Sequence, residues 1–371
     1  MNKPNKVKFG LIGSGSFGRF CLEAISELKE VELFAISDLN ERLAKKTARN
    51  FKTKWYTDPL KLISDPDVEM IHIVTPPFTH YSLTVASLQQ NKHVLCEKPL
   101  ALSLKEADEM LQLAKQKDKI LPVNFILRYV PVTDIVKKVI DSKIFGEPIR
   151  AYFENYATDE NMAAAHWFWD KRKSGGIFIE HGVHFFDLYC HWFGEAEVIW
   201  AHTQKRNSTG REDRVFCFLH HSSGVLANHY HGFDQPKLLD RQIHRLLFER
   251  GDIVIHGWVP EWFKIDALVN DYQIKQLEKI FKPTKIHSIK KLNSSEQKIK
   301  ARGKKISVNQ RIQIEYRPNI DKLTLYSEAI KNLVRDQIIF IHNKKHQRVV
   351  TEQNGRRALA LAISACERGS A

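Results

Sequence analysis

Residues 7–18 of the chain read VKFGLIGSGSFG, and this stretch decides the class of fold. The apolar run from Val7 to Ile12 predicts a buried strand, and the glycines after it predict a tight turn. Beyond the turn, apolar residues recur at helical spacing, at Phe17, Cys21, Ala24 and Leu28. The stretch therefore predicts a strand, a glycine-rich turn and a helix.

The same alternation continues to about residue 125. Further strands are predicted over residues 31–36, 70–74, 93–96 and 120–125, and helices over 41–50, 81–90 and 104–115. Apolar strands that alternate with helices indicate a parallel sheet covered on both faces. Residues 1–125 are therefore expected to form an α/β domain of the Rossmann type, with a doubly wound parallel sheet.

The pattern changes from residue 126 onward. A helix is predicted over residues 132–141, and an alternation with period two begins at Ile149. Short strands rich in β-branched and aromatic residues are predicted over 198–202, 215–220, 224–231, 245–249 and 252–256. These segments predict an α+β domain with a mixed or antiparallel sheet over 126–351. A last helix is predicted over 354–366, within a C-terminal segment 352–371.

The glycine turn has the spacing of a dinucleotide-binding fingerprint. The first glycine permits the tight turn, the second lets backbone amides approach a pyrophosphate, and the third permits close packing of the helix. The helix N-terminus adds partial positive charge. The cofactor contacts expected from this turn are Gly13, Ser14, Gly15, Ser16, Phe17 and Gly18.

Asp38 follows the second predicted strand, twenty residues after Gly18. A carboxylate at this position accepts hydrogen bonds from ribose hydroxyls and repels a 2′-phosphate, so NAD is the predicted cofactor. No arginine follows immediately, but Arg42 lies close enough to keep NADP open as the less favoured cofactor.

The composition is that of a globular protein. The 371 residues are 43% hydrophobic and 27% charged, which excludes a wholly disordered chain. No run approaches the roughly 18 apolar residues of a membrane span and no export signal is visible, so no membrane partner and a cytoplasmic location are expected. The 5 cysteines lack the spacing of a disulfide framework or a zinc site.

The net charge of +14 is compatible with nucleic acid or with an anionic ligand. The most basic stretch, residues 282–305, has Glu296 as its one acidic residue and lacks the interleaved aromatics of a nucleic-acid module. We expect this stretch to be a solvated hairpin or loop insertion, and we predict no nucleic-acid partner.

Three further motifs point to one known family. The first contains Thr75, Pro76 and His80, and the second is Glu97, Lys98 and Pro99. The third comprises Trp169, Asp170, Gly175, Gly176, Glu180, Gly182, His184 and Asp187. In this order, and together with the glycine fingerprint, these motifs resemble the Gfo/Idh/MocA-type oxidoreductases, named for glucose-fructose oxidoreductase and inositol dehydrogenase. The resemblance covers nearly the whole chain.

The resemblance implies a second domain built on a large, mostly antiparallel sheet, which binds substrate and mediates assembly as a homodimer or homotetramer. It implies that the C-terminal helix packs back near the Rossmann domain. The implied substrate is a sugar, a sugar derivative or a cyclitol, bound near the nicotinamide. Further cofactor contacts implied by the motifs are Thr75, Pro76, His80, Glu97 and Lys98.

The resemblance places Lys98 near the reacting carbon and makes His184 its proton partner, whereas Glu180 stands where the family most often has aspartate. The chemistry agrees, because an alcohol that loses a hydride must also lose a proton, and a desolvated lysine near the positively charged nicotinamide gives up its own proton readily. Glu180 would orient the imidazole or bind a substrate hydroxyl. Tentative substrate contacts are Arg128, Tyr129, Trp167 and His181.

The expected enzyme is an NAD-dependent dehydrogenase that acts on CH–OH groups. Two alternatives stay open: NAD-assisted glycoside cleavage by oxidation, elimination and reduction without net redox change, and a non-catalytic regulator that senses NAD and sugar. His184, Asp187 and His191 share one helical stripe suited in principle to a metal. Hydride transfer needs no metal, and none is predicted.

Overall fold

The computed structural model describes residues 6–160, 162–281 and 286–369, and the chain divides into two units. Unit 1 combines the described residues up to Tyr129 with Ala164–Asp187 and Tyr326–Ile363. Unit 2 combines Val130–Ala163, Leu188–Leu325 and the described residues from Ser364 onward. Each unit is thus assembled from segments far apart in the sequence. The domain boundaries expected at residues 125 and 351 stay predictions.

Unit 1 is built on a five-stranded sheet in the order β3-β2-β1-β4-β5, in which each neighbouring pair is parallel. The strands are β1 (Val7–Ile12), β2 (Val31–Ser37), β3 (Lys54–Tyr56), β4 (Met70–Ile73) and β5 (His93–Cys96). The strand order reverses between β1 and β4, and sheets of this kind bind ligands beyond the carboxyl ends of the strands at such a reversal. The predicted doubly wound parallel sheet is confirmed.

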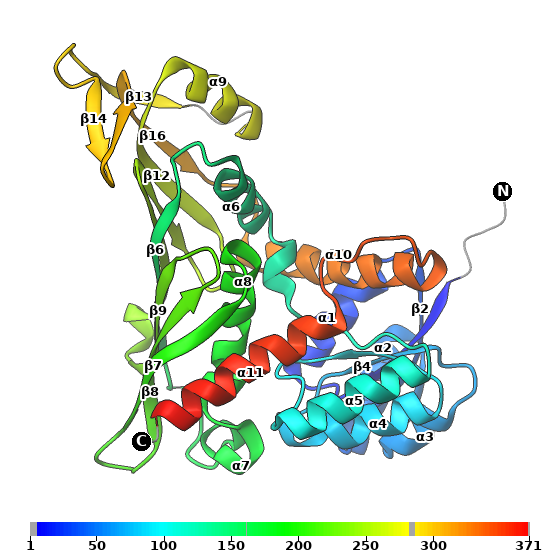
Figure 1. The fold of residues 1–371 in the computed structure, drawn as a ribbon. Coiled ribbons are helices and arrows are strands. Elements are labelled where there is room, and N and C mark those ends of the chain that lie inside the picture. Colours follow the sequence, from blue (N-terminus) through cyan, green and yellow to red (C-terminus); the bar gives the residue numbers. More distant parts are fainter. Residues whose placement is uncertain (1–5, 161, 282–285, 370–371) are drawn as a thin grey trace, which may run out of the picture. The chain divides into compact units, whose positions relative to one another are not determined.

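Helices lie on both faces of this sheet, with α1 and α10 on one face and α3, α4 and α5 on the other (Figure 1). The helices of unit 1 are α1 (Ser16–Ser26), α2 (Glu41–Phe51), α3 (Pro59–Ser64), α4 (His80–Gln89), α5 (Leu104–Gln116), α7 (Lys171–Ser174), most of α10 (Lys322–His342) and the part of α11 (Glu352–Gly369) up to Ile363. Short turns are η1 (Pro77–Thr79), η2 (Ile126–Tyr129), η3 (Trp167–Trp169) and the π-helical turn η4 (Phe178–Gly182). The elements β3, α3 and α10 were not among those predicted.

The strand predicted over residues 120–125 is wrong, because only a single bridge forms there, between Cys96 and Val123. The Pro122 carbonyl accepts a hydrogen bond from the Cys96 amide. Pro122 itself has no N–H to donate in return, so the pairing beside β5 is interrupted there. The neighbouring Leu121 amide instead donates to Glu352 Oε1 of α11 at 3.1 Å.

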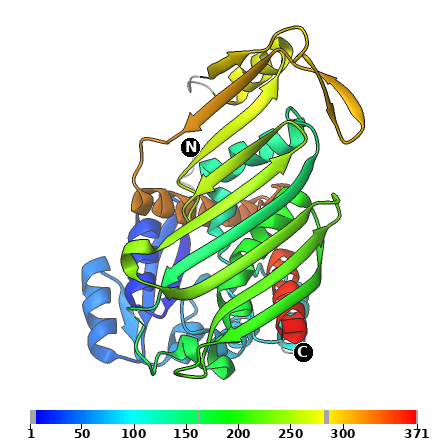
Figure 2. The same ribbon diagram turned by 90° about the vertical axis from the view of Figure 1, so that its left-hand side faces the viewer.

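Unit 2 contains a nine-stranded sheet in the order β13-β16-β12-β11-β10-β6-β9-β8-β7 (Figure 2). Its strands are β6 (Pro148–Thr158), β7 (Ala196–Lys205), β8 (Glu212–His221), β9 (Leu226–Gln235), β10 (Arg241–Phe248), β11 (Gly251–His256), β12 (Trp262–Val269), β13 (His287–Lys291) and β16 (Gln310–Tyr316). Among these described strands only β6 and β9 pair in parallel. The predicted large, mostly antiparallel sheet of an α+β domain is confirmed.

The other elements of unit 2 are α6 (Pro131–Ser142), α9 (Asp271–Ile280), the turn η5 (Lys237–Leu239) and the end of α8 (Val183–Phe193). The basic segment expected over residues 282–305 begins outside the described residues. Its described part forms β13 at the edge of the large sheet and the exposed hairpin of β14 (Lys298–Ala301) with β15 (Lys304–Ser307). No helix of the described chain is both long and apolar enough to cross a bilayer.

The sheet of unit 2 buries several imidazole rings. Among its buried side chains are four histidines, His221, His229, His231 and His244. Burial lowers the pKa of His221 to about 4 and the pKa of both His231 and His244 to about 3. Burial also lowers the pKa of His229 well below its usual range. These rings are therefore neutral in the folded protein at neutral pH.

We expect unit 2 to lose stability in acid because these histidines take up protons only when the chain unfolds. Stability is full above about pH 6.5 and falls as the pH drops below it, by up to about 1.4 kcal/mol per pH unit for each histidine. Thermal unfolding measured from about pH 8 down to about pH 4.5 should show a steep fall in Tm below pH 6.5. His231→Phe should reduce the dependence of Tm on pH. The control is His220→Phe, at the exposed residue that precedes His221, and it should leave this dependence unchanged. A Tm that stays flat across this range would contradict the expectation.

Candidate functional site

The two outer glycines of the turn between β1 and α1 leave no room for a side chain. A Cβ at Gly13, whose φ is +97°, would lie 2.2 Å from the Val74 carbonyl oxygen. A Cβ at Gly18 would lie 2.0 Å from the Gly13 carbonyl oxygen. In contrast, a Cβ at Gly15 would meet no atom within 4 Å. Gly15 therefore keeps space open on the ligand side of the turn.

The open side of this turn fits a dinucleotide. Gly15 and Ser16 are exposed at the start of α1, whose first turn has no acidic residue. The Ser14 amide and hydroxyl donate to Asp38 Oδ2 at 2.8 and 3.0 Å, which brings the Asp38 carboxylate to the turn. Amides for a pyrophosphate and a carboxylate for a ribose thus lie together, so the residues fit NAD.

Phe17 contributes differently from its neighbours in the turn. Its ring packs against Phe20 and Tyr326, with centroid distances of 6.4 and 5.7 Å. The Phe17 side chain thus joins α1 to α10.

His80 connects the loop after β4 to the loop after β5. Its Nε2 lies 2.8 Å from the Thr75 carbonyl oxygen and its Nδ1 lies 2.7 Å from the Pro99 carbonyl oxygen. Burial lowers the pKa of this imidazole. The Thr75 and Thr79 hydroxyls also hydrogen-bond at 2.6 Å, and the Thr79 hydroxyl donates to the Pro76 carbonyl at 2.8 Å. The two loops that carry Pro76 and Lys98 are therefore fixed to each other.

Lys98 and Glu180 form a close ion pair within unit 1. Lys98 Nζ donates to Glu180 Oε1 at 2.5 Å and to the Glu180 carbonyl oxygen at 2.8 Å. Glu180 lies in η4, which follows a chain reversal at Gly175 and Gly176, with φ of +83° and +93°. Only glycine adopts such backbone angles readily. The turn at this glycine pair thus places the Glu180 carboxylate next to Lys98.

His184 lies near this pair on the first turn of α8. The ring is buried, 6.2 Å from the Phe125 ring. Burial, and secondly the charge of Lys98, lower the pKa of His184 well below its usual range. Unit 1 thus brings Lys98, Glu180 and a neutral His184 together.

Arg128 and Tyr129, the tentative substrate contacts after residue 125, have protein partners. Arg128 Nε and Nη2 donate to the two carboxylate oxygens of Asp187 at 2.7 and 2.8 Å, in a buried pair. The Tyr129 hydroxyl donates to Asp336 Oδ2 at 2.6 Å. The structure therefore places both side chains in contacts that hold unit 1 together.

Trp167 and His181, the other tentative substrate contacts, are partly exposed. Trp167 lies in η3 beside His166 and Phe168. The next helix, α7, lies against η1, so this loop borders the turn at Thr75 and Pro76. His181 directly follows Glu180, and its ring centroid is 5.1 Å from that of Phe185.

Glu97, one of the cofactor contacts implied by the motifs, has two buried partners that were missed from the sequence, His72 and Asn124. Glu97 Oε1 accepts hydrogen bonds from His72 Nε2 at 3.0 Å and from Asn124 Nδ2 at 2.6 Å. The exposed fractions of His72, Glu97 and Asn124 are only 0%, 7% and 1%. The sequence signal for these partners was His72, a polar residue within the otherwise apolar strand β4.

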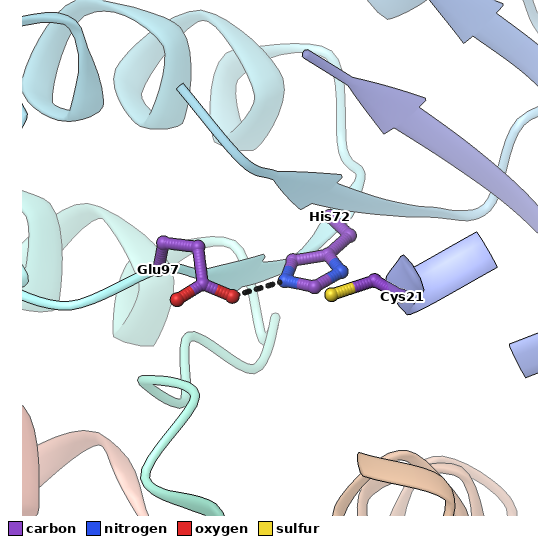
Figure 3. Close-up of side chains that lie close together, drawn as sticks. All are labelled: Cys21, His72 and Glu97. Carbon is purple, nitrogen blue, oxygen red and sulfur yellow. Dashed lines mark hydrogen bonds and ion pairs between the residues drawn. The ribbon is translucent and has the colours of Figure 1, made fainter. Parts of the chain in front are cut away.

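Cys21, His72 and Glu97 also bring three metal-binding atom types within 4.8 Å of one another (Figure 3). Burial raises the pKa of the Cys21 thiol well above its usual range, which disfavours the thiolate that binds metals. Glu97 Oε1 also already accepts two hydrogen bonds. The group is therefore better described as a hydrogen-bonded network.

Two curated proteins illustrate the relatives of this chain. It is 30% identical over 228 residues to myo-inositol 2-dehydrogenase of Thermotoga maritima, a match that covers 60% of this chain and 67% of the relative. It is 27% identical over 232 residues to scyllo-inositol 2-dehydrogenase (NAD(+)) of Bacillus subtilis, covering 60% and 66%. The chain thus matches about two thirds of the length of these relatives.

A solved structure of levoglucosan dehydrogenase with NADH and levoglucosan superposes with a TM-score of 0.79 at 18% identity, covering 99% of this chain and 98% of that one. This likeness shows the shared fold. Residues 7–125 match the family model described as an oxidoreductase family with an NAD-binding Rossmann fold, and residues 134–253 match the GFO/IDH/MocA C-terminal domain. The chain belongs to the GFO/IDH/MocA oxidoreductase family, the family that its motifs resemble, with the NAD-binding domain predicted for it.

Proposed function

We propose that the protein is an NAD-dependent dehydrogenase that oxidises a secondary alcohol of a sugar, a sugar derivative or a cyclitol. The observation that carries the proposal is the contact of Lys98 with Glu180 beside the buried His184, in the same unit as the glycine turn. The relatives named inositol dehydrogenases support the substrate class. Assembly as a homodimer or homotetramer and a cytoplasmic location stay predictions.

Lys98 is the residue that exchanges the substrate proton in this proposal. NAD, when bound, supplies the acceptor for the hydride. The Lys98 amine takes the proton of the alcohol during oxidation, and the Lys98 ammonium returns it to a carbonyl during reduction. The contact with Glu180 holds the Lys98 side chain in one place for both directions.

Glu180 is the direct proton partner of Lys98 in this proposal, whereas the motif resemblance assigned that role to His184. Glu180 Oε1 lies 2.5 Å from Lys98 Nζ, so a proton moves between them without rearrangement. Burial lowers the pKa of His184, so the imidazole stays neutral next to the charged Lys98. His184 thus serves as a neutral polar neighbour of the pair.

A substrate screen tests the function directly. Sugars, sugar acids, cyclitols and glycosides are incubated with NAD+ or NADP+, and nicotinamide absorbance and product release are followed together. Accumulation of NADH with a polyol supports the proposal. Glycoside cleavage without accumulation of NADH would replace it with the oxidation, elimination and reduction route. Binding of NAD+ without turnover of any compound would favour a sensing role.

Lys98→Ala should abolish proton exchange while it leaves the glycine turn intact. We expect kcat to fall by about 10²- to 10⁴-fold, since general acid–base catalysis contributes that much. The NAD+ dissociation constant, measured by fluorescence titration, should change little. Unchanged turnover in this variant would end the proposal.

Glu180→Gln and Glu180→Asp separate the carboxylate from the side-chain length. Glu180→Gln removes the proton acceptor of Lys98 and should lower kcat by about tenfold or more. Glu180→Asp restores the more common residue of the motif and should retain most of the activity. Steady-state kinetics give kcat for both variants. If kcat falls equally in both, the length of the side chain matters more than its charge.

Gly15→Ala should impair cofactor binding without harm to the fold. The backbone of Gly15, with φ of −59° and ψ of −171°, accepts alanine, and the new methyl group would meet no protein atom within 4 Å. It would occupy the space left for the pyrophosphate, so NAD+ affinity should fall by about tenfold while Tm is retained. Gly18→Ala is the matched control and should lower Tm instead, because its methyl group would clash with the Gly13 carbonyl. Unchanged NAD+ affinity of Gly15→Ala would contradict this assignment.

A further inference from the structure

The residue that precedes Lys98 is attached to the protein through both its backbone and its side chain. The Glu97 amide donates to the Ile73 carbonyl at 3.0 Å, which continues the β4–β5 pairing. The Glu97 carboxylate accepts from His72 and from Asn124. The Asn124 backbone N–H in turn donates to the Cys96 backbone carbonyl at 2.8 Å. Glu97 is therefore locked to the end of β4 and to the segment that follows β5.

This network is not explained by stability. Ile71 and Ile73, on either side of His72, are fully buried, and an apolar residue at position 72 would suit the strand. Two buried atoms of the network, His72 Nδ1 and Asn124 Oδ1, have no hydrogen-bond partner within the part of the chain that the structure describes. A buried polar atom without a hydrogen-bond partner lowers stability. Buried polar groups that oppose stability are expected where function requires them.

The network also controls where Lys98 points. A carboxylate oxygen only accepts hydrogen bonds, so His72 donates from Nε2 and Asn124 donates from Nδ2. Glu97 and Lys98 share a peptide bond, so holding both the backbone and the side chain of Glu97 restricts the positions from which Lys98 Nζ reaches Glu180.

We propose that His72 is a positioning residue for Lys98, which acts by holding the Glu97 carboxylate, and the proposal rests on the dehydrogenase function proposed above. His72 touches neither the substrate nor the reacting atoms. It keeps the Glu97–Lys98 segment in one conformation, so that Lys98 Nζ stays in contact with Glu180. The chemistry required at position 72 is a hydrogen-bond donor at the reach of Nε2.

Three variants test this role. His72→Leu removes the donor, and His72→Gln keeps an N–H donor at similar reach. His93→Leu is the matched control, because His93 lies on β5, accepts the Ile120 amide through Nδ1 and is remote from Lys98 in the strand. For each variant we would measure Tm, NAD+ affinity, kcat and KM. The rate of acylation of Lys98 without substrate, read by peptide mass spectrometry, reports on the Lys98–Glu180 contact independently of activity.

We expect His72→Leu to lower kcat by about 10- to 100-fold, since a displacement of about 1 Å at a catalytic group has that effect. Lys98 should be acylated faster in this variant because it leaves Glu180, and His72→Gln should restore both kcat and the slow acylation. His93→Leu should change Tm alone. The positioning role is overturned if His72→Leu keeps the parental kcat and acylation rate, or if the parent contains one equivalent of zinc that His72→Leu loses. Retained turnover in Lys98→Ala would instead overturn the proposed function, so the two failures are distinguishable.

Discussion

The arrangement of the site depends on the buried ion pair between Arg128 and Asp187. These residues are 59 positions apart, and they join the end of the first segment of unit 1 to the end of its Ala164–Asp187 segment. Burial raises the pKa of the Asp187 carboxyl, and the Arg128 guanidinium opposes that shift. Loss of either partner would strand a buried charge, which costs about 3–5 kcal/mol. Glu180 and His184 lie on the segment that Asp187 ends, so this pair anchors the segment that carries them to the rest of unit 1.

Burial then decides which groups of unit 1 carry charge. His80 and His184 have lowered pKa values because their rings are removed from water. Lys98 and Glu180 retain partial access to water and satisfy each other as a pair. The charged pair of unit 1 thus lies beside imidazole rings whose pKa values burial has lowered.

Local patterns predicted much of this molecule. The glycine turn, Asp38 and the alternation of strands and helices are short-range features, and each appears where the residues indicate. The roles of Gly13, Gly15 and Gly18 differ as the fingerprint implies, because two abut backbone carbonyls and one faces open space. Long-range pairings were not predictable in the same way. The periodicity of residues 120–125 suits a strand, yet Pro122 lacks the donor that a ladder needs. His72, Arg128 and Asp187 acquire their partners only when distant segments meet.

The order of the segments of unit 1 has a consequence for folding during synthesis on the ribosome. Gly355 of α11 abuts Val123 and Leu100, and Tyr326 of α10 contacts Phe17. These contacts join segments that are made at widely separated times. Domains generally fold as they emerge, at about 5–20 residues per second. At this rate the strands β1 and β2 are made roughly tens of seconds before α10 and α11, and until then their unit lacks the contacts that these helices supply.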